Sequence, residues 1–209
     1  MKQNDWAYME KYALENSLLQ KQPTQGNRIV FIGDSITEFW KQYDFDFFSQ
    51  NDYINRGISS QTTSQILERF ENDVINLQPN SVIILAGIND VAENNGPISI
   101  EIIMGNITQM VEKSLKNNCK VVLCSILPAN NFYWNPKIQP IEKIKQLNEL
   151  IEAYCLSKKI KYIDYYSKMV DENFGLDKKY TNDGVHPNLN GYLKMKSILK
   201  FHLQHSPIK

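Results

Sequence analysis

The sequence predicts an α/β fold, a three-layer α/β/α sandwich built around a five-stranded parallel sheet. First, short runs rich in Val and Ile alternate along the chain with longer segments of helical periodicity. Second, these runs are apolar at successive positions, as strands that are buried on both faces must be. Third, a chain of 209 residues with 42% hydrophobic residues is long enough for one well-formed core and too short for two full domains.

Five runs are expected to form the strands of this sheet. They lie at residues 28–33, 53–56, 81–86, 120–126 and 160–164. Strands that alternate with helices form β-α-β units with right-handed crossovers, so all five should be parallel. The pattern alone does not determine their order, but the flavodoxin-like order 2-1-3-4-5 is one of the two common solutions and is the one expected.

Four helices are expected between and after the strands, because apolar residues recur three or four positions apart. Thr62 and Gln65 resemble a capping box at the start of the first helix, and Pro187 suits the start of the last. The apolar faces consist, helix by helix, of Ile66, Phe70 and Val74; of Ile103, Ile107, Met110 and Val111; of Ile141, Ile144, Leu147, Ile151 and Tyr154; and of Tyr192, Met195, Leu199 and His202.

A further helix, from about Asp5, is expected to precede the first strand. Residues 1–27 would then form an N-terminal helical extension of a single domain whose core spans residues 28–209. The residues of this helix that are expected to pack on the body are Trp6, Met9 and Ala13.

Composition and charge exclude several classes of protein. Lys and Arg number 23, as do Asp and Glu, so there is no excess of positive charge to neutralise phosphates, and we expect no nucleic-acid partner. Three cysteines without a CxxC pair do not make a disulfide framework.

No apolar run approaches the roughly 20 residues that span a bilayer, so no membrane insertion is expected. The first twenty residues are charged throughout, which indicates a soluble, cytoplasmic protein as written, or a periplasmic or secreted one if a signal peptide was removed.

Candidate functional residues follow the predicted strands, since parallel sheets bind ligands beyond the carboxyl ends of their strands. After the first strand, Gly33 permits a sharp turn that would expose the hydroxyl of Ser35 above the sheet, with its N–H at a helix N-terminus. Gly57 after the second strand could lend a backbone N–H, and Asn89 after the third could lend a side-chain amide. Each of these residues, read alone, is also an ordinary cap or turn residue.

Asp183 and His186 lie near the C-terminus and are three residues apart. Residues at this spacing share one helical turn, so Asp183 could orient the imidazole of His186. Together with Ser35, Gly57 and Asn89, the pair supplies every role of acyl transfer: nucleophile, base, orienting carboxylate and donors to an oxyanion.

Four segments that contain these residues resemble the sequence blocks of the SGNH hydrolases, also called GDSL esterases and acylhydrolases. The segments are residues 32–37 (IGDSIT), 55–58 (NRGI), 87–90 (GIND) and 183–187 (DGVHP), and they occur in the family's order. The first block reads GDSI where the family's other name has Leu at the fourth position. The N-terminal helix and the RGIS form of the second block are similar to the platelet-activating-factor acetylhydrolase-like subgroup.

The resemblance implies a site and a mechanism. Ser35 would be the nucleophile, His186 the general base and then acid, and Asp183 the residue that orients His186. The oxyanion hole would comprise the N–H groups of Ser35 and Gly57 and the side-chain amide of Asn89. No metal and no cofactor are implied, and the subgroup favours short acyl chains.

The expected function is that of a serine esterase that cleaves a short acyl ester, chiefly acetyl, from a small polar or carbohydrate substrate through an acyl-enzyme. Asp34, Tyr133 and Trp134 are candidates for substrate binding. The last two lie in a polar and aromatic loop, residues 127–140, whose aromatic side chains could line the pocket or, equally, anchor the loop to the body.

Other functions remain open. They are a lysophospholipase or thioesterase-type acylhydrolase, an acyltransferase of the same fold, and a non-catalytic carbohydrate-binding module. A non-catalytic member should lack one of the four functional residues, and all four are present here.

His202 and His205 are spaced three apart, but no third ligand accompanies them, so a surface helix is favoured over a zinc site. Cys124, inside a predicted strand, is interpreted as a small apolar filler.

Overall fold

The computed structural model describes residues 5–22 and 27–205 and contains a five-stranded parallel sheet. The strand order is β2-β1-β3-β4-β5, which confirms the expected order 2-1-3-4-5. The strands are β1 (Ile29–Gly33), β2 (Tyr53–Gly57), β3 (Ser81–Leu85), β4 (Lys120–Cys124) and β5 (Lys161–Ile163). All five residues of the central β3 are buried, as a strand covered on both faces requires.

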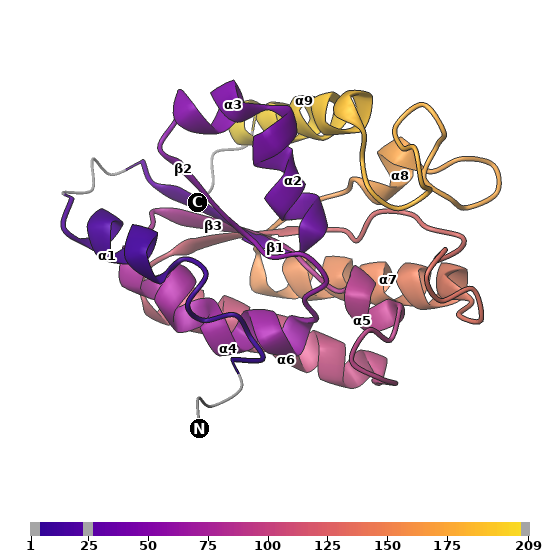
Figure 1. Ribbon diagram of the computed structural model, residues 1–209, viewed down its shortest axis with the longest axis horizontal. Helices are drawn as coiled ribbons and strands as arrows, with labels where there is room; N and C mark the ends of the chain where they lie inside the picture. Colours follow the sequence, from indigo (N-terminus) through magenta and orange to yellow (C-terminus); the bar gives the residue numbers. More distant parts are fainter. Residues whose placement is uncertain (1–4, 23–26, 206–209) are drawn as a thin grey trace.

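Helices cover both faces of the sheet (Figure 1), which confirms the three-layer sandwich. The helices on one face are α2 (Ser35–Tyr43), α3 (Phe45–Ser49) and α9 (Leu189–His205). Those on the other face are α4 (Thr63–Asp73), α6 (Ile100–Lys116) and α7 (Pro140–Lys158), and α1 (Ala13–Gln20) packs beside α4. Three short elements complete the described chain: the 3₁₀ helix η1 (Ile75–Leu77), α5 (Ile88–Val91) and α8 (Tyr166–Met169).

A cluster of aromatic side chains holds α2 and α3 on the sheet. Trp40 of α2 stacks on Phe47 of α3 with ring centroids 5.5 Å apart, and both contact Phe31 of β1 edge to face. Each of these side chains is almost completely buried, and burial of such a ring contributes roughly 1.5–3 kcal/mol to folding. The cluster therefore fixes the position of α2, the helix that begins with Ser35.

The capping box at Thr62 and Gln65 is confirmed at the start of α4. The last helix starts later than expected, at Leu189 instead of Pro187. Pro187 forms an isolated β-bridge with Thr181, and the Asn188 side chain accepts the N–H of Gly191. Asn188 thus caps α9, and the chain before it remains extended.

The expected helix from Asp5 is wrong for its first turns. Residues 6–7 and 9–12 form turns, and the helix α1 begins only at Ala13. The Asp5 carboxylate accepts the N–H groups of Met9 and Glu10 and so closes a local turn. As a result Trp6 and Ala13 are exposed and Met9 is half-buried, while Ala7 and Asn16 are buried against the body.

Candidate active site

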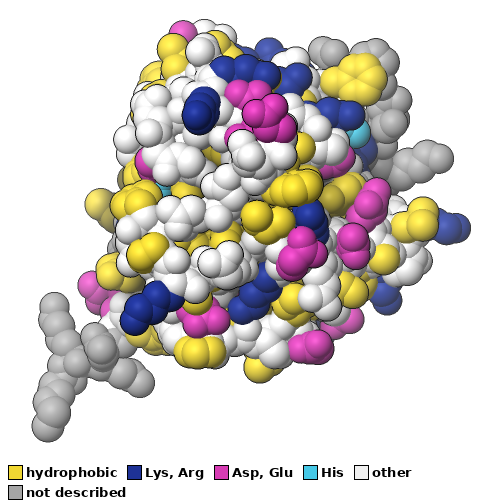
Figure 2. Space-filling model, turned by 90° about the vertical axis from the view of Figure 1, so that its right-hand side faces the viewer, with side chains coloured by type: hydrophobic (Ala, Val, Ile, Leu, Met, Phe, Trp, Pro, Cys, Tyr) yellow, Lys and Arg dark blue, Asp and Glu magenta, His cyan; other side chains and the backbone are white. Residues whose placement is uncertain are grey.

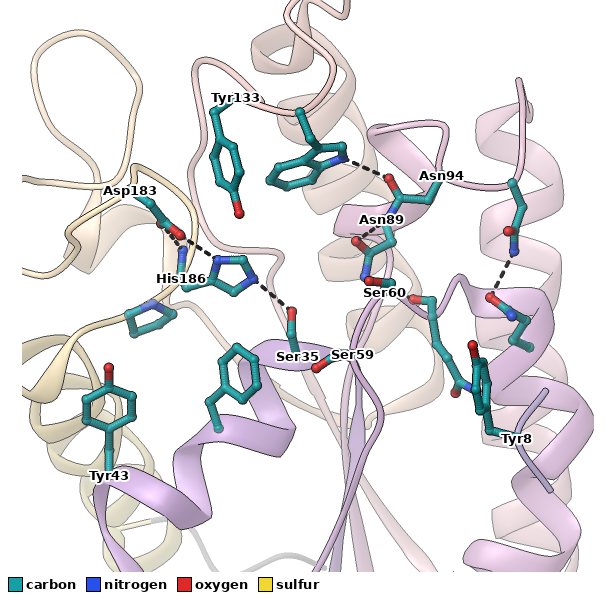
Figure 3. A pocket seen from close by; sticks show the side chains of 16 residues that line it. Tyr8, Ser35, Tyr43, Ser59, Ser60, Asn89, Asn94, Tyr133, Asp183 and His186 are labelled. Atoms are coloured by element: carbon teal, nitrogen blue, oxygen red, sulfur yellow. Dashed lines mark hydrogen bonds and ion pairs between the residues drawn. The ribbon is translucent and has the colours of Figure 1, made fainter. Parts of the chain in front are cut away.

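Ser35, His186 and Asp183 form a hydrogen-bonded chain at the carboxyl end of the sheet (Figure 3). The Oγ of Ser35 lies 3.0 Å from Nε2 of His186, and Nδ1 of His186 lies 2.7 Å from Oδ2 of Asp183. The structure thus brings together three predicted residues, although Asp183 and His186 lie about 150 positions after Ser35 in the sequence. The arrangement can move a proton from the Ser35 hydroxyl to an imidazole that a carboxylate holds in place.

The turn between β1 and α2 determines where Ser35 lies. A Cβ at Gly33 would come within 2.2 Å of the Leu85 carbonyl oxygen, so only glycine fits there. The Asp34 side chain accepts the N–H of Ile36 and caps α2. Ser35 is consequently the first residue of the helix, where its N–H has no acceptor within the helix and can bind an anion.

Asp34 was a candidate for substrate binding, and the structure corrects this expectation. The residue is only 1% exposed and is absent from the lining of the active-site cavity, because its carboxyl is folded back onto the helix start. Burial raises the pKa of Asp34 to about 7. The hydrogen bond from the Ile36 N–H only partly offsets the cost of burial, so near neutral pH this buried carboxyl is only partly ionised.

Asp34→Asn is expected to stabilise the protein at neutral pH and above. Asparagine keeps an oxygen for the N–H of Ile36 and carries no charge. Between the ordinary pKa of about 3.9 and the raised pKa of about 7, the unfolded chain has lost the Asp34 proton while the folded chain retains it, so the free energy of unfolding of the wild type falls as pH rises. The shift of about three units sets an upper limit of about 4 kcal/mol.

The measurement is urea unfolding of both proteins between about pH 4 and pH 8. The difference in free energy of unfolding should open as pH rises through this window and reach the order of 1 to 4 kcal/mol at its upper end. A difference that does not change with pH would contradict the assigned cause.

The Asp183 carboxylate is held by the loop that also carries His186. Its Oδ1 accepts the backbone N–H groups of Val185 and His186, at 2.9 and 2.8 Å, which leaves Oδ2 to accept from the imidazole. Burial opposes ionisation, but the hydrogen bonds from the His186 ring and from these two N–H groups outweigh it, so the pKa of Asp183 is lowered. Gly184, with a φ of +86°, allows this tight turn.

Asn89 follows β3 and presents its amide to the same pocket. Its Oδ1 accepts from the Asn94 side chain at 2.8 Å, and the Oδ1 of Asn94 in turn accepts from the indole N–H of Trp134 at 2.9 Å. The Nδ2 of Asn89 is consequently the donor, and it lies 3.1 Å from the Gln61 carbonyl oxygen. Sequence reasoning missed Asn94, which lies beyond the strand end and matches no motif.

Gly57, an expected oxyanion donor, lies outside the cavity, which is a second correction. Its N–H donates to the Asn55 side chain at 2.9 Å, and its carbonyl accepts from the Tyr12 hydroxyl. Glycine is required here because a Cβ would lie 2.1 Å from the Glu38 nitrogen of α2.

Ser60, and not Gly57, lines the cavity beside Asn89. Its φ is +65°, and its N–H has no acceptor among the described residues.

The cavity around these residues has a volume of about 790 Å³. Tyr133 and Trp134 line it, whereas their neighbour Phe132 is fully buried, so the loop after β4 both anchors itself and lines the pocket. Seen from this end of the molecule, most of the surface is yellow hydrophobic side chains or is white, the colour of the backbone and of the other uncharged side chains (Figure 2). The lining consists of Tyr8, Phe39, Tyr43, Tyr133 and Trp134, of Ser35, Ser59, Ser60, Gln61, Gln65, Asn89, Asn94 and Asn95, and of Asp183, His186 and Pro187.

Comparison with known proteins assigns this chain to a family. The sequence model of the GDSL-like lipase/acylhydrolase family matches residues 31–194. The chain belongs to this family. This family is the one that the four sequence blocks resemble.

Solved structures and curated sequences agree with this family assignment. A GDSL-like lipase from Bacteroides thetaiotaomicron is 46% identical, with a TM-score of 0.91 over 95% of this chain and 98% of that one. A protein from Bacteroides fragilis proposed to be an acylhydrolase is 45% identical, with a TM-score of 0.93 over 97% and 98%. Platelet-activating factor acetylhydrolase IB subunit alpha1 of Rattus norvegicus is 31% identical over 130 residues, 60% of this chain and 52% of that protein. The chain thus spans about half the length of the curated relatives it matches.

Cys124 and His202 of the last helix lie apart from the active-site cavity. Cys124 is buried in β4, and burial raises the pKa of its thiol far above the ordinary value. The side chain of His205 lies outside the described residues, and among those described no group of three or more His, Cys, Asp or Glu is placed to hold a metal ion. In residues 5–22 and 27–205 no helix has the length and apolar character of a membrane span.

Proposed function

We propose that this GDSL-type acylhydrolase is a serine esterase that removes a short acyl group, chiefly acetyl, from a hydroxyl-rich small molecule or carbohydrate. Ser35 is the nucleophile, His186 the general base and then acid, and Asp183 the residue that orients His186. The N–H groups of Ser35 and Ser60 and the amide of Asn89 are the donors to the oxyanion.

The proposed reaction proceeds through an acyl-enzyme. The Oγ of Ser35 attacks the ester carbonyl carbon and passes its proton to Nε2 of His186, while the oxyanion that forms is stabilised by donors already in place. Collapse of the tetrahedral intermediate breaks the bond to the alcohol, which leaves with the proton from His186. Water then attacks the acyl-enzyme with the help of the same base, and the carboxylic acid and free Ser35 are released.

The observation that carries the substrate proposal is the character of the cavity wall. Apart from Pro187, every apolar side chain among the described lining residues is aromatic, and none of these residues is Leu, Ile, Val, Met, Lys or Arg. A long acyl chain gains roughly 0.8 kcal/mol per methylene only where it can be buried in an apolar channel. Phosphate groups of lysophospholipids or thioester cofactors bind best to Arg or Lys. A short acyl group on a neutral alcohol fits this wall best.

A panel of esters tests the proposal. The kcat/KM for p-nitrophenyl esters should be highest for acetate and butyrate and fall at least about tenfold by octanoate, and acetylated saccharides should be deacetylated. Faster cleavage of lysophospholipids or acyl thioesters would contradict the substrate class. Ester products formed with an added alcohol acceptor would identify an acyltransferase, and saccharide binding without turnover would identify a binding module.

A further inference from the structure

Residues 5–12, which we call the N-terminal arm, form part of the active-site wall. The arm precedes the residues 31–194 that the family model matches. The carbonyl of Ala7 accepts the side-chain N–H of Gln61 at 2.7 Å, and the carbonyl of Trp6 accepts that of Gln65 at 2.6 Å. Gln61 also accepts the Asn89 amide through its own carbonyl. The backbone of the arm is thereby tied to the segment that presents the oxyanion donors.

Tyr8 adopts a backbone conformation that a tyrosine rarely takes. Its φ is +54°, in the left-handed region, which is strained for a residue with a large side chain. Asp5 holds the conformation, because its carbonyl accepts the Tyr8 N–H at 3.0 Å and its carboxylate accepts the N–H groups of Met9 and Glu10. Glycine or asparagine would fit this position with less strain.

The Tyr8 side chain does not compensate this strain by packing. It is 56% exposed, and its ring pairs with no other aromatic ring among the described residues. It lines the same cavity as Ser35 and Asn89, on the side away from Tyr43 and Asp183 (Figure 3). An exposed aromatic ring that lines this cavity and sits on a strained backbone is suited to contact a ligand.

We infer that Tyr8 is a specificity-determining residue that stacks on the alcohol part of the ester, a sugar or another ring. The inference rests on the proposed function, because an acetyl group bonded to Ser35 is too small to extend past the oxyanion donors to the arm. Only the alcohol can fill the remainder of a cavity of about 790 Å³. Tyr8 would then act opposite Tyr133 and Trp134, so that the ring of the alcohol lies between aromatic side chains.

The test compares Tyr8→Asn and Tyr8→Phe with the wild type. Asparagine accepts the left-handed backbone but removes the ring, whereas phenylalanine keeps the ring. Two pairs of acetyl esters are assayed, an acetylated disaccharide against ethyl acetate and 2-naphthyl acetate against ethyl acetate. The control is Trp6→Ala. Trp6 carries an exposed aromatic ring on the same arm, but this ring does not line the cavity.

In Tyr8→Asn the kcat/KM ratio of the ring-bearing ester to ethyl acetate should fall about three- to tenfold, mainly through KM, with an unchanged or higher Tm. Tyr8→Phe and Trp6→Ala should keep the ratio of the wild type. An unchanged ratio in Tyr8→Asn, or an equal fall in Trp6→Ala, would overturn the inference. If the wild type does not accept the disaccharide, the carbohydrate proposal fails and the naphthyl pair still decides the role of Tyr8. A wild type inactive on every acetyl ester would overturn both.

Discussion

Ser35→Ala is expected to lower kcat for acetyl esters by a factor on the order of 10⁶ and to leave the Tm almost unchanged. In the proposed mechanism the Oγ of Ser35 forms the covalent bond of the acyl-enzyme, and no other hydroxyl is placed within hydrogen-bond distance of His186 Nε2 among the described residues. The fold loses little, since the contact of Ser35 with His186 at 3.0 Å is only part-buried and a hydrogen bond of this kind contributes about 1 kcal/mol. Steady-state kinetics and thermal unfolding of one preparation measure both effects.

Ser125→Ala provides a matched control with the opposite pattern. Ser125 follows β4 at the same edge of the sheet as Ser35, but it is fully buried, and its Oγ accepts the Tyr166 N–H at 2.9 Å. Its loss should lower the free energy of unfolding by about 1–3 kcal/mol and leave the kcat of the folded enzyme nearly intact. Activity retained in Ser35→Ala, or lost in Ser125→Ala without unfolding, would show that the nucleophile is misassigned.

The sheet and the chain of Ser35, His186 and Asp183 could be predicted because their signals are local. Successive apolar residues mark strands that are buried on both faces, and the residues after such strands meet at one edge of a parallel sheet. Asp183 and His186 are three positions apart, so a single turn brings them together without help from the rest of the fold. Only Ser35 has to be positioned from a distant part of the chain.

The proposed oxyanion donors were harder to predict because they depend on backbone conformation. In RGIS the glycine is the conspicuous residue, yet Gly57 is required for the close approach of α2, whereas Ser60 occupies the left-handed region with nothing in its side chain to indicate it. Asn94 is joined to Asn89 through side-chain hydrogen bonds, and hydrogen bonds between side chains leave no periodicity in a sequence.

The N-terminal arm and its surroundings were mispredicted for a related reason. The arm docks through polar contacts of its carbonyls with Gln61 and Gln65, so a search for an apolar stripe placed the wrong side chains on the body.

Arg69 is another residue whose position could not be predicted from an apolar stripe. It is fully buried in α4, where it donates to Gln61, Asp73 and the Gly33 carbonyl. Hydrophobic periodicity places a charged residue such as Arg69 on the solvent-exposed face of a helix. Arg69 instead links the turn before Ser35 to the segment that presents Ser60.

Asp183→Asn is expected to lower kcat by about 10³- to 10⁴-fold while the enzyme remains folded. The reason lies in the two oxygens of the carboxylate. Oδ1 accepts the N–H groups of Val185 and His186, so the amide oxygen of asparagine must take this position. The NH₂ group is then placed against Nδ1 of His186, which lies 2.7 Å from Oδ2 in the wild type.

A donor at that position reverses the tautomer of the imidazole, and this reversal explains the size of the expected effect. With Nδ1 accepting from the amide, the ring proton of neutral His186 moves to Nε2, which can no longer accept the proton of Ser35. The loss should therefore appear in kcat with little change in KM, in a protein whose Tm is close to that of the wild type. Asp177→Asn is the control, since Asp177 lies in the same region, pairs with Lys179 at 2.6 Å and does not line the cavity. If Asp183→Asn lowers kcat no more than Asp177→Asn does, Asp183 does not determine which nitrogen of His186 carries the proton.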